Sequence, residues 1–180
     1  MKIQRRHIGG FVFSVWALIA GGLLYFSNAT KLISFDPQGH LGQKAASMDF
    51  DQQFLFWLNK QGLKTHSTVI HITEPDCPCF AISQPHRKSV AALATTYNFE
   101  NQHIDWNEAM SDYVPASPAV VVISDNGRLA YFGPYSSGAF CTADNGLVEP
   151  FIKGKRQTLP GAVVITDAIG CYCNSISTKG

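Results

Sequence analysis

The chain has 180 residues, which suggests one domain with short additions, and its formal net charge at pH 7 is only +1. Such a chain gives no electrostatic reason to bind phosphate backbones, so we expect no nucleic-acid partner. It contains five cysteines, an odd number, so at least one cannot form a disulfide within a monomer.

The first predicted element is a run of 19 residues, 8–26, without a charged side chain. A helix needs about 20 apolar residues to cross a bilayer. Three basic residues precede the run, whereas only Lys31 follows closely, and this bias favours a cytoplasmic N-terminus. We therefore predict that residues 1–26 are a single-pass anchor in the inner membrane, which places the remaining chain in the periplasm.

A cleaved secretory signal is the alternative, because residues 27–29, Ser-Asn-Ala, resemble a cleavage site. Both interpretations export the domain into an oxidising compartment, where disulfides form and persist. Residues 27–46 show little periodicity and are predicted to be a tether.

From residue 47 onward the pattern predicts alternating helices and strands. Phe50, Phe54 and Leu58 share one face of a helix that begins at Ser47 and ends at Gly62. The later predicted elements are a strand at 68–73, a helix at 83–97, a weak strand at 101–106, a helical turn at 107–113, a strand at 119–124, a hairpin strand at 128–132, a short helix at 145–153 and a strand at 162–166.

Four cysteines form two C-x-C pairs at the ends of predicted strands. Cys77 and Cys79 flank Pro78 between the strand at 68–73 and the helix that follows, and Cys171 and Cys173 come after the last strand. A cysteine pair at such a junction can be a redox site, part of a metal site or a disulfide staple.

This order of elements resembles the thioredoxin fold over roughly residues 47–154. Cys77 and Cys79 match the place of that family's redox cysteines, and Pro118 matches its cis-proline, although one residue separates the cysteines here where the family has two. The whole chain also resembles a group of membrane-anchored thioredoxin-like proteins of Gram-negative bacteria. The resemblance implies an α/β fold with a central mixed sheet flanked by helices, in residues 47–180, with an extra C-terminal strand and the C-Y-C segment.

If the strands at 68–73 and 119–124 are antiparallel neighbours, as that fold requires, then Cys77, Cys79 and Pro118 share one edge of the sheet. The hairpin sends the loop with Cys141 toward the same edge, and the last strand brings Cys171 and Cys173 there as well. We therefore expect all five sulfurs to cluster.

A cluster of this kind favours thiol–disulfide exchange with exported client proteins or a redox partner protein. We expect Cys77 to attack, Cys79 to resolve the mixed disulfide, and the backbone at Ser117 and Pro118 to hold the client as an added strand. The helix N-terminus favours a thiolate whereas the nearby acidic side chains Glu74 and Asp76 disfavour it.

Two alternatives stay open for the same cysteines. Cys77 and Cys79 can form structural bridges to Cys171 and Cys173, or the four thiolates can hold zinc or copper. The principal hypothesis assigns no cofactor and no metal ligand, treats Cys171 and Cys173 as a second thiol pair or a structural disulfide, and leaves Cys141 without a role.

Overall fold

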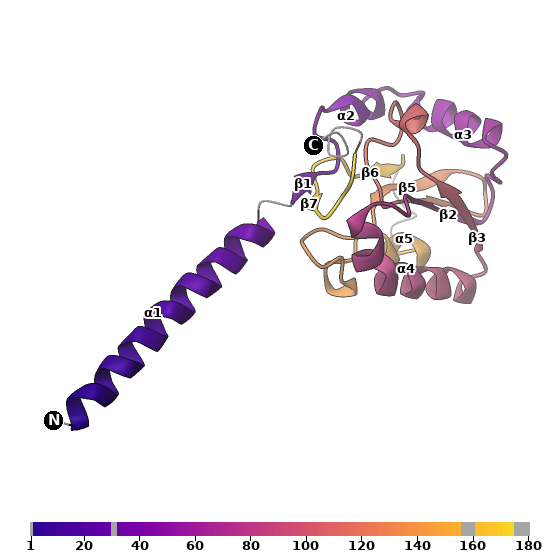
Figure 1. The fold of residues 1–180 in the computed structure, drawn as a ribbon. Coiled ribbons are helices and arrows are strands. Elements are labelled where there is room, and N and C mark those ends of the chain that lie inside the picture. Colours follow the sequence, from indigo (N-terminus) through magenta and orange to yellow (C-terminus); the bar gives the residue numbers. More distant parts are fainter. Residues whose placement is uncertain (1, 30–31, 156–160, 175–180) are drawn as a thin grey trace. The chain divides into compact units, whose positions relative to one another are not determined.

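The structure is a computed structural model that describes residues 2–29, 32–155 and 161–174. The chain divides into two compact units, residues 1–32 and residues 33–180. The first unit holds one helix, α1 (Lys2–Ala29), of 28 residues (Figure 1).

The predicted membrane anchor is the main correction that the structure brings. Among the described residues, no helix has the combination of length and apolar character that crossing a membrane demands. The prediction of a transmembrane helix at residues 8–26 is therefore wrong. The single-pass inner-membrane location and the periplasmic placement of the domain rested on that helix, and they are withdrawn with it.

A mixed α/β arrangement, which the sequence predicted, forms the second unit. Its main sheet has five strands in the order β3-β2-β4-β5-β6, where β2 and β3 are parallel, β4 is antiparallel to both β2 and β5, and β6 is parallel to β5. These strands are β2 (Thr68–Thr73), β3 (Glu100–Asp105), β4 (Ala119–Ile123), β5 (Leu129–Pro134) and β6 (Val163–Val164). A separate antiparallel pair joins β1 (Ile33–Ser34) to β7 (Ile169–Gly170).

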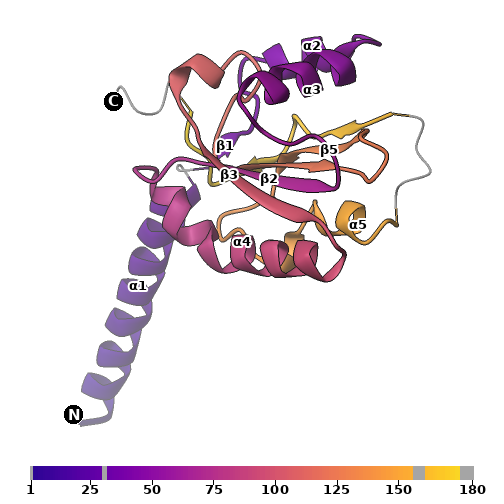
Figure 2. The same cartoon turned by 90° about the vertical axis from the view of Figure 1, so that its right-hand side faces the viewer.

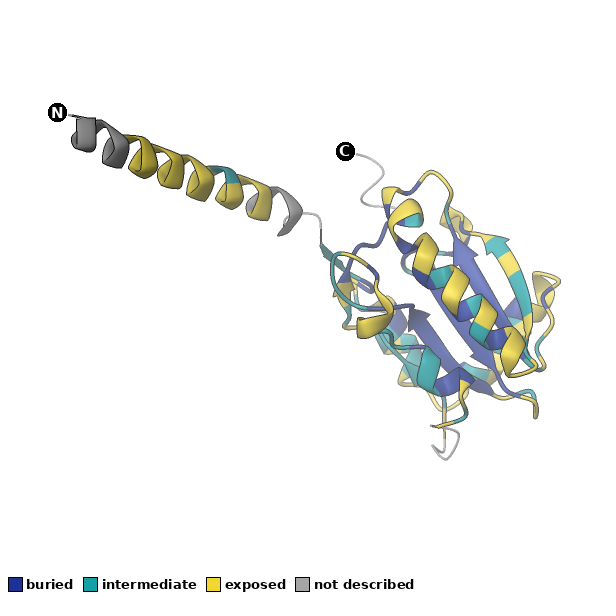
Figure 3. Ribbon diagram, turned by 90° about the horizontal axis from the view of Figure 1, so that it is seen from below, coloured by how far each residue is buried: buried dark blue, intermediate teal, exposed yellow. Residues whose placement is uncertain are grey.

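Helices cover both faces of the sheet (Figure 2). One face carries α2 (His40–Ala45) and α3 (Phe50–Lys60), and the other carries α4 (Pro78–Thr96) and α5 (Glu149–Ile152). Two short 3-10 turns, η1 (Glu108–Met110) and η2 (Ala143–Asn145), lie in the loops. All residues of β2 and β4 are buried, whereas the edge strand β3 is partly exposed (Figure 3). The uniformly apolar run in β4 suits a strand covered on both faces.

Both helices that flank the sheet centre begin at positions other than predicted. The N-cap of α3 is Asp49 and not the predicted Ser47. The Ser47 hydroxyl instead donates a hydrogen bond to the Asp49 carboxylate. α4 begins at Pro78, five residues before the predicted start. Proline at the first helical position has a suitable φ and needs no N–H partner, so the C-P-C segment is itself the first turn of α4.

Candidate functional site at the cysteine edge

Strand direction gathers the candidate residues at one edge of the sheet. Ile72 near the end of β2 lies opposite Ala119 at the start of β4, and Ala119 lies opposite Pro134 at the end of β5. The segments that follow β2 and β5 and precede β4 therefore meet there, as predicted from the order of the elements. We call this place the cysteine edge and define it by Cys77, Cys79, Cys141, Cys171 and Cys173.

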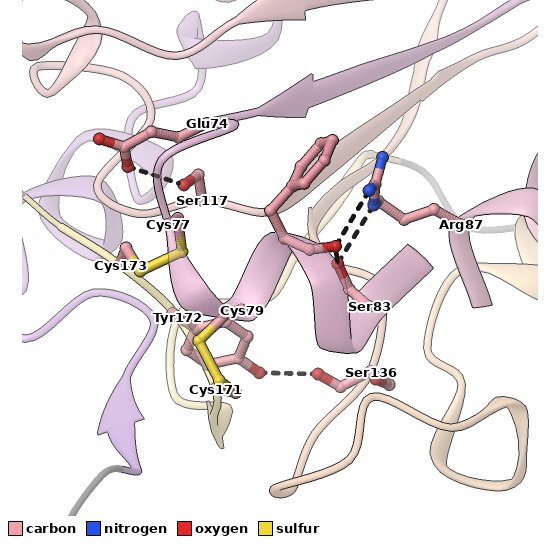
Figure 4. Close-up of a disulfide and its surroundings, with 11 residues drawn as sticks. Glu74, Cys77, Cys79, Ser83, Arg87, Ser117, Ser136, Cys171, Tyr172 and Cys173 are labelled. Atoms are coloured by element: carbon pink, nitrogen blue, oxygen red, sulfur yellow. Dashed lines mark hydrogen bonds between the residues drawn. A yellow bond between two sulfur atoms is a disulfide. The ribbon is translucent and has the colours of Figure 1, made fainter. Parts of the chain in front are cut away.

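All five cysteines form one buried cluster, which confirms the prediction that distant parts of the chain bring them together. Four of them form two bridges, Cys77–Cys173 with an S–S distance of 2.10 Å and Cys79–Cys171 with 2.02 Å (Figure 4). Each bridge joins the C-P-C segment to the C-Y-C segment. This is the pairing that the alternative of structural bridges predicted. Neither C-x-C pair forms a disulfide between its own two cysteines.

The two bridges lie close enough for sulfur exchange between them. The Sγ atoms of Cys77, Cys79 and Cys173 all lie within 4.8 Å of one another. A thiolate at any of these positions would have a second sulfur nearby, which is the geometry that disulfide exchange requires. The four bridged cysteines are 4–8% exposed, and Cys77 at 4% is no more exposed than Cys79 at 5%, so exposure does not favour Cys77 as the attacking residue.

The predicted client-binding edge is occupied by the chain's own C-terminal segment. The peptide bond between Ser117 and Pro118 is cis, as the resemblance implied. The Ser117 N–H donates to the Cys173 carbonyl at 2.8 Å, and the Cys173 N–H donates to the Ser117 carbonyl at 2.8 Å. Cys173 is thus paired through its backbone with Ser117 and through its sulfur with Cys77.

Further contacts hold the C-terminal segment, residues 171–173, in place. The Tyr172 hydroxyl donates to the Ser136 carbonyl at 2.7 Å, and the Tyr172 ring packs edge-on against Phe35 at 5.4 Å between centroids. The Cys171 N–H donates to the Gly138 carbonyl at 3.2 Å. Burial raises the pKa of the Tyr172 hydroxyl, so this donor keeps its proton at any physiological pH.

The electrostatic environment of the bridges is set by the N-terminus of α4 and by two acidic side chains that precede it. Cys77 caps the N-terminus of this 19-residue helix, which has no acidic side chain in its first turn. The helix dipole therefore favours negative charge at Cys77 and Cys79. Glu74 accepts a hydrogen bond from the Ser117 hydroxyl at 3.3 Å (Figure 4). Asp76 is exposed to solvent.

Cys141 is the unpaired thiol among the described residues, and it is buried. Burial raises the pKa of its thiol, and thiolates rather than thiols attack disulfides. Its environment therefore suits an unreactive side chain better than a redox cysteine.

Sequence reasoning missed two buried polar pairs on the side of the sheet that α4 covers. His71 contacts the Tyr135 hydroxyl at 2.5 Å and Asn101 Oδ1 at 2.8 Å, and burial lowers the pKa of His71 to about 4. His86 in α4 is buried and contacts Glu149 at 2.5 Å. Helical spacing could have revealed this, because His86 precedes the buried residues Val90 and Ala94 at intervals of four.

One protein family has a sequence model that matches residues 47–175, and its description is Domain of unknown function (DUF6436). No curated protein and no solved structure matches the chain. The matched range includes both C-x-C pairs, Cys141 and the Ser117–Pro118 bond.

Proposed function

The chain belongs to the DUF6436 family, and we propose that it carries out thiol–disulfide exchange at the cysteine edge of a thioredoxin-like domain. The observation that carries the proposal is that Cys79 Sγ lies within 4.8 Å of both sulfurs of the Cys77–Cys173 bridge. A structural staple needs only its own two sulfurs, whereas exchange needs a third sulfur within reach.

The exchange begins at the Cys77–Cys173 bridge. A client thiolate attacks Cys77 Sγ, the bond to Cys173 breaks, and Cys173 leaves as a thiolate. The second client thiolate then attacks the client sulfur of the mixed disulfide, and Cys77 leaves as a thiolate. The client has lost two electrons and gained a disulfide, and the Cys77–Cys173 pair has gained both electrons.

The second bridge serves as a reserve of oxidising equivalents. The Cys77 thiolate attacks Cys79 Sγ, which breaks the bond to Cys171 and forms a Cys77–Cys79 disulfide. In this step Cys79 is attacked rather than resolving a mixed disulfide, and the electrons pass to the C-Y-C segment. The N-terminus of α4 stabilises the Cys77 thiolate that these steps require.

Docking of a client follows from the contacts of the C-terminal segment. Both sulfurs of the Cys77–Cys173 bridge are buried, so residues 171–173 must move away from Ser117 before a client reaches Cys77. The Ser117 N–H and C=O groups then become free to pair with an extended client chain. Cys173 already occupies the position of a client cysteine, since it is bonded to Cys77 and paired with Ser117.

The test follows the oxidation of a peptide with two thiols by the oxidised full chain, read as loss of peptide thiols. Cys77→Ser should lower the rate by about tenfold or more, which corresponds to about 1.4 kcal/mol in the barrier. Cys141→Ser is the matched control, because it removes a thiol from the same cluster but not from a bridge, and its rate should be unchanged. Equal rates for the chain and for Cys77→Ser would contradict the proposal.

A further inference from the structure

The reduced form of the cysteine edge holds four thiols close together, and thiol–disulfide exchange alone does not require all four at once. When both bridges accept two electrons each from a dithiol or phosphine, four thiols remain on two short segments. Cys77 and Cys79 are two residues apart at the start of α4, and Cys171 and Cys173 are two residues apart in the C-terminal segment. Figure 4 shows the two bridges next to each other between the start of α4 and the C-terminal segment, so the four thiols form in one place.

We propose that the reduced chain binds one Zn²⁺ ion through the thiolates of Cys77, Cys79, Cys171 and Cys173. This metal-binding activity goes beyond exchange, because it requires no client and no transfer of electrons once the thiols have formed. Thiolates are preferred ligands of Zn²⁺, and four of them arranged as a tetrahedron form a common type of structural zinc site.

The spacing of the sulfurs fits this geometry with small movements. A Zn–S bond of about 2.3 Å places the sulfurs of a tetrahedral site about 3.8 Å apart. The Sγ atoms of Cys77, Cys79 and Cys173 already lie within 4.8 Å of one another. Cys171 Sγ is bonded to Cys79 Sγ but lies outside that group, so it has to move toward the other sulfurs once its bridge opens. Rotation about the Cα–Cβ bonds can supply such movements of the sulfurs.

Burial and charge also favour a metal in the reduced form. Every cysteine of the set is 4–8% exposed, and unpaired thiolates in such a place are strongly disfavoured. A divalent cation compensates their charge, and the N-terminus of α4 adds further stabilisation of negative charge. The metal would also hold the C-terminal segment against Ser117 when no disulfide does so.

The experiment uses the full chain reduced with a phosphine under anaerobic conditions, with Co²⁺ as the spectroscopic probe and Zn²⁺ as the competitor. We expect one Co²⁺ per chain, with the absorption of a tetrahedral thiolate site, and displacement of this signal by one equivalent of Zn²⁺. The oxidised chain should give no signal, because its thiolates are absent. Cys141→Ser should bind as the unaltered chain does, whereas Cys173→Ser should bind at least about tenfold more weakly.

A second measurement needs no variant and so does not depend on how a variant folds. The reduced chain is alkylated with and without Zn²⁺, and the modified cysteines are identified by mass spectrometry. Zn²⁺ should protect the four proposed ligands and leave the rate at Cys141 unchanged. Absence of the Co²⁺ absorption, equal binding by the oxidised chain, or protection that does not distinguish Cys141 from the four ligands would overturn the proposal.

Discussion

The two bridges should contribute to stability in a strongly non-additive way, because one encloses the other. Cys77–Cys173 joins positions 96 residues apart, and Cys79–Cys171 joins positions 92 residues apart within that loop. Either bridge alone therefore constrains almost the same length of unfolded chain. When both are present, the second closes only a small ring made of residues 77–79 and 171–173.

The magnitudes follow from the chain-entropy treatment of crosslinks. A loop of about 95 residues is worth about 4.7 kcal/mol and a ring of six residues about 2 kcal/mol. Replacing one bridge with two alanines should thus cost about 2 kcal/mol in unfolded-chain entropy, whichever bridge is removed, and replacing both should cost about 7 kcal/mol. The loss of both exceeds the sum of the separate losses by about 2 to 3 kcal/mol.

The assay is urea unfolding of three variants without reductant: Cys77→Ala with Cys173→Ala, Cys79→Ala with Cys171→Ala, and all four together. A Cys141→Ala background prevents pairing with the fifth cysteine. Each pair of substitutions also shortens buried side chains. The same cost occurs again in the fourfold variant, so it largely cancels when the two separate losses are subtracted from the combined loss. Additive losses would refute the reasoning, because they would mean that the bridges close separate loops, as Cys77–Cys79 and Cys171–Cys173 pairs would.

Two further predictions concern residues other than the cysteines. His71 has a folded-state pKa of about 4, below its ordinary value of 6.5, so the unfolded chain binds the proton more tightly and stability should fall by about 3 kcal/mol as pH drops from about 6.5 to 4. Urea unfolding should show this pH dependence much reduced in His71→Gln and retained in the control His66→Gln, whose side chain is exposed; equal profiles for both variants would refute the assignment. Gly170→Ala would place a methyl group 2.7 Å from the Tyr172 ring and should lower stability by about 1 to 3 kcal/mol, whereas Gly161→Ala, which meets nothing within 4 Å, should change the urea midpoint little. Equal midpoints for these two glycine variants would contradict the packing described for Tyr172.

The sequence located the strands of the sheet centre better than the helices. Runs rich in β-branched residues mark β2 and β4 closely, because strands buried on both faces are mostly apolar, although β2 also buries Thr68, His71 and Thr73. Strand direction, together with the strand pairing that the resemblance implied, then placed the cysteines and Pro118 at a common edge. The predicted start of α4 at residue 83 put Pro85 in the first turn, where proline is tolerated, whereas Pro85 lies inside the helix.

The pairing of the sulfurs and the C-terminal contacts depended on three-dimensional distances that local patterns do not contain. Four cysteines allow three pairings, and the positions of the sulfurs in the folded chain select one of them. Similarly, the contact between His71 and Tyr135 joins residues 64 positions apart. The absence of charge over residues 8–26 suggested a membrane anchor, yet among the described residues the structure finds no helix long and apolar enough for that role.

Exchange at the cysteine edge is tested most directly by titrating the full chain in a redox buffer of a small thiol and its disulfide. Each step is trapped with acid, the bridges are mapped by mass spectrometry, and the fold is followed by circular dichroism. We predict that Cys77–Cys173 opens first, that the small thiol is found bonded to Cys77, and that the sheet persists because Cys79–Cys171 still closes the long loop. Bridges that stay closed until the whole domain unfolds would contradict an exchange function and identify both as structural.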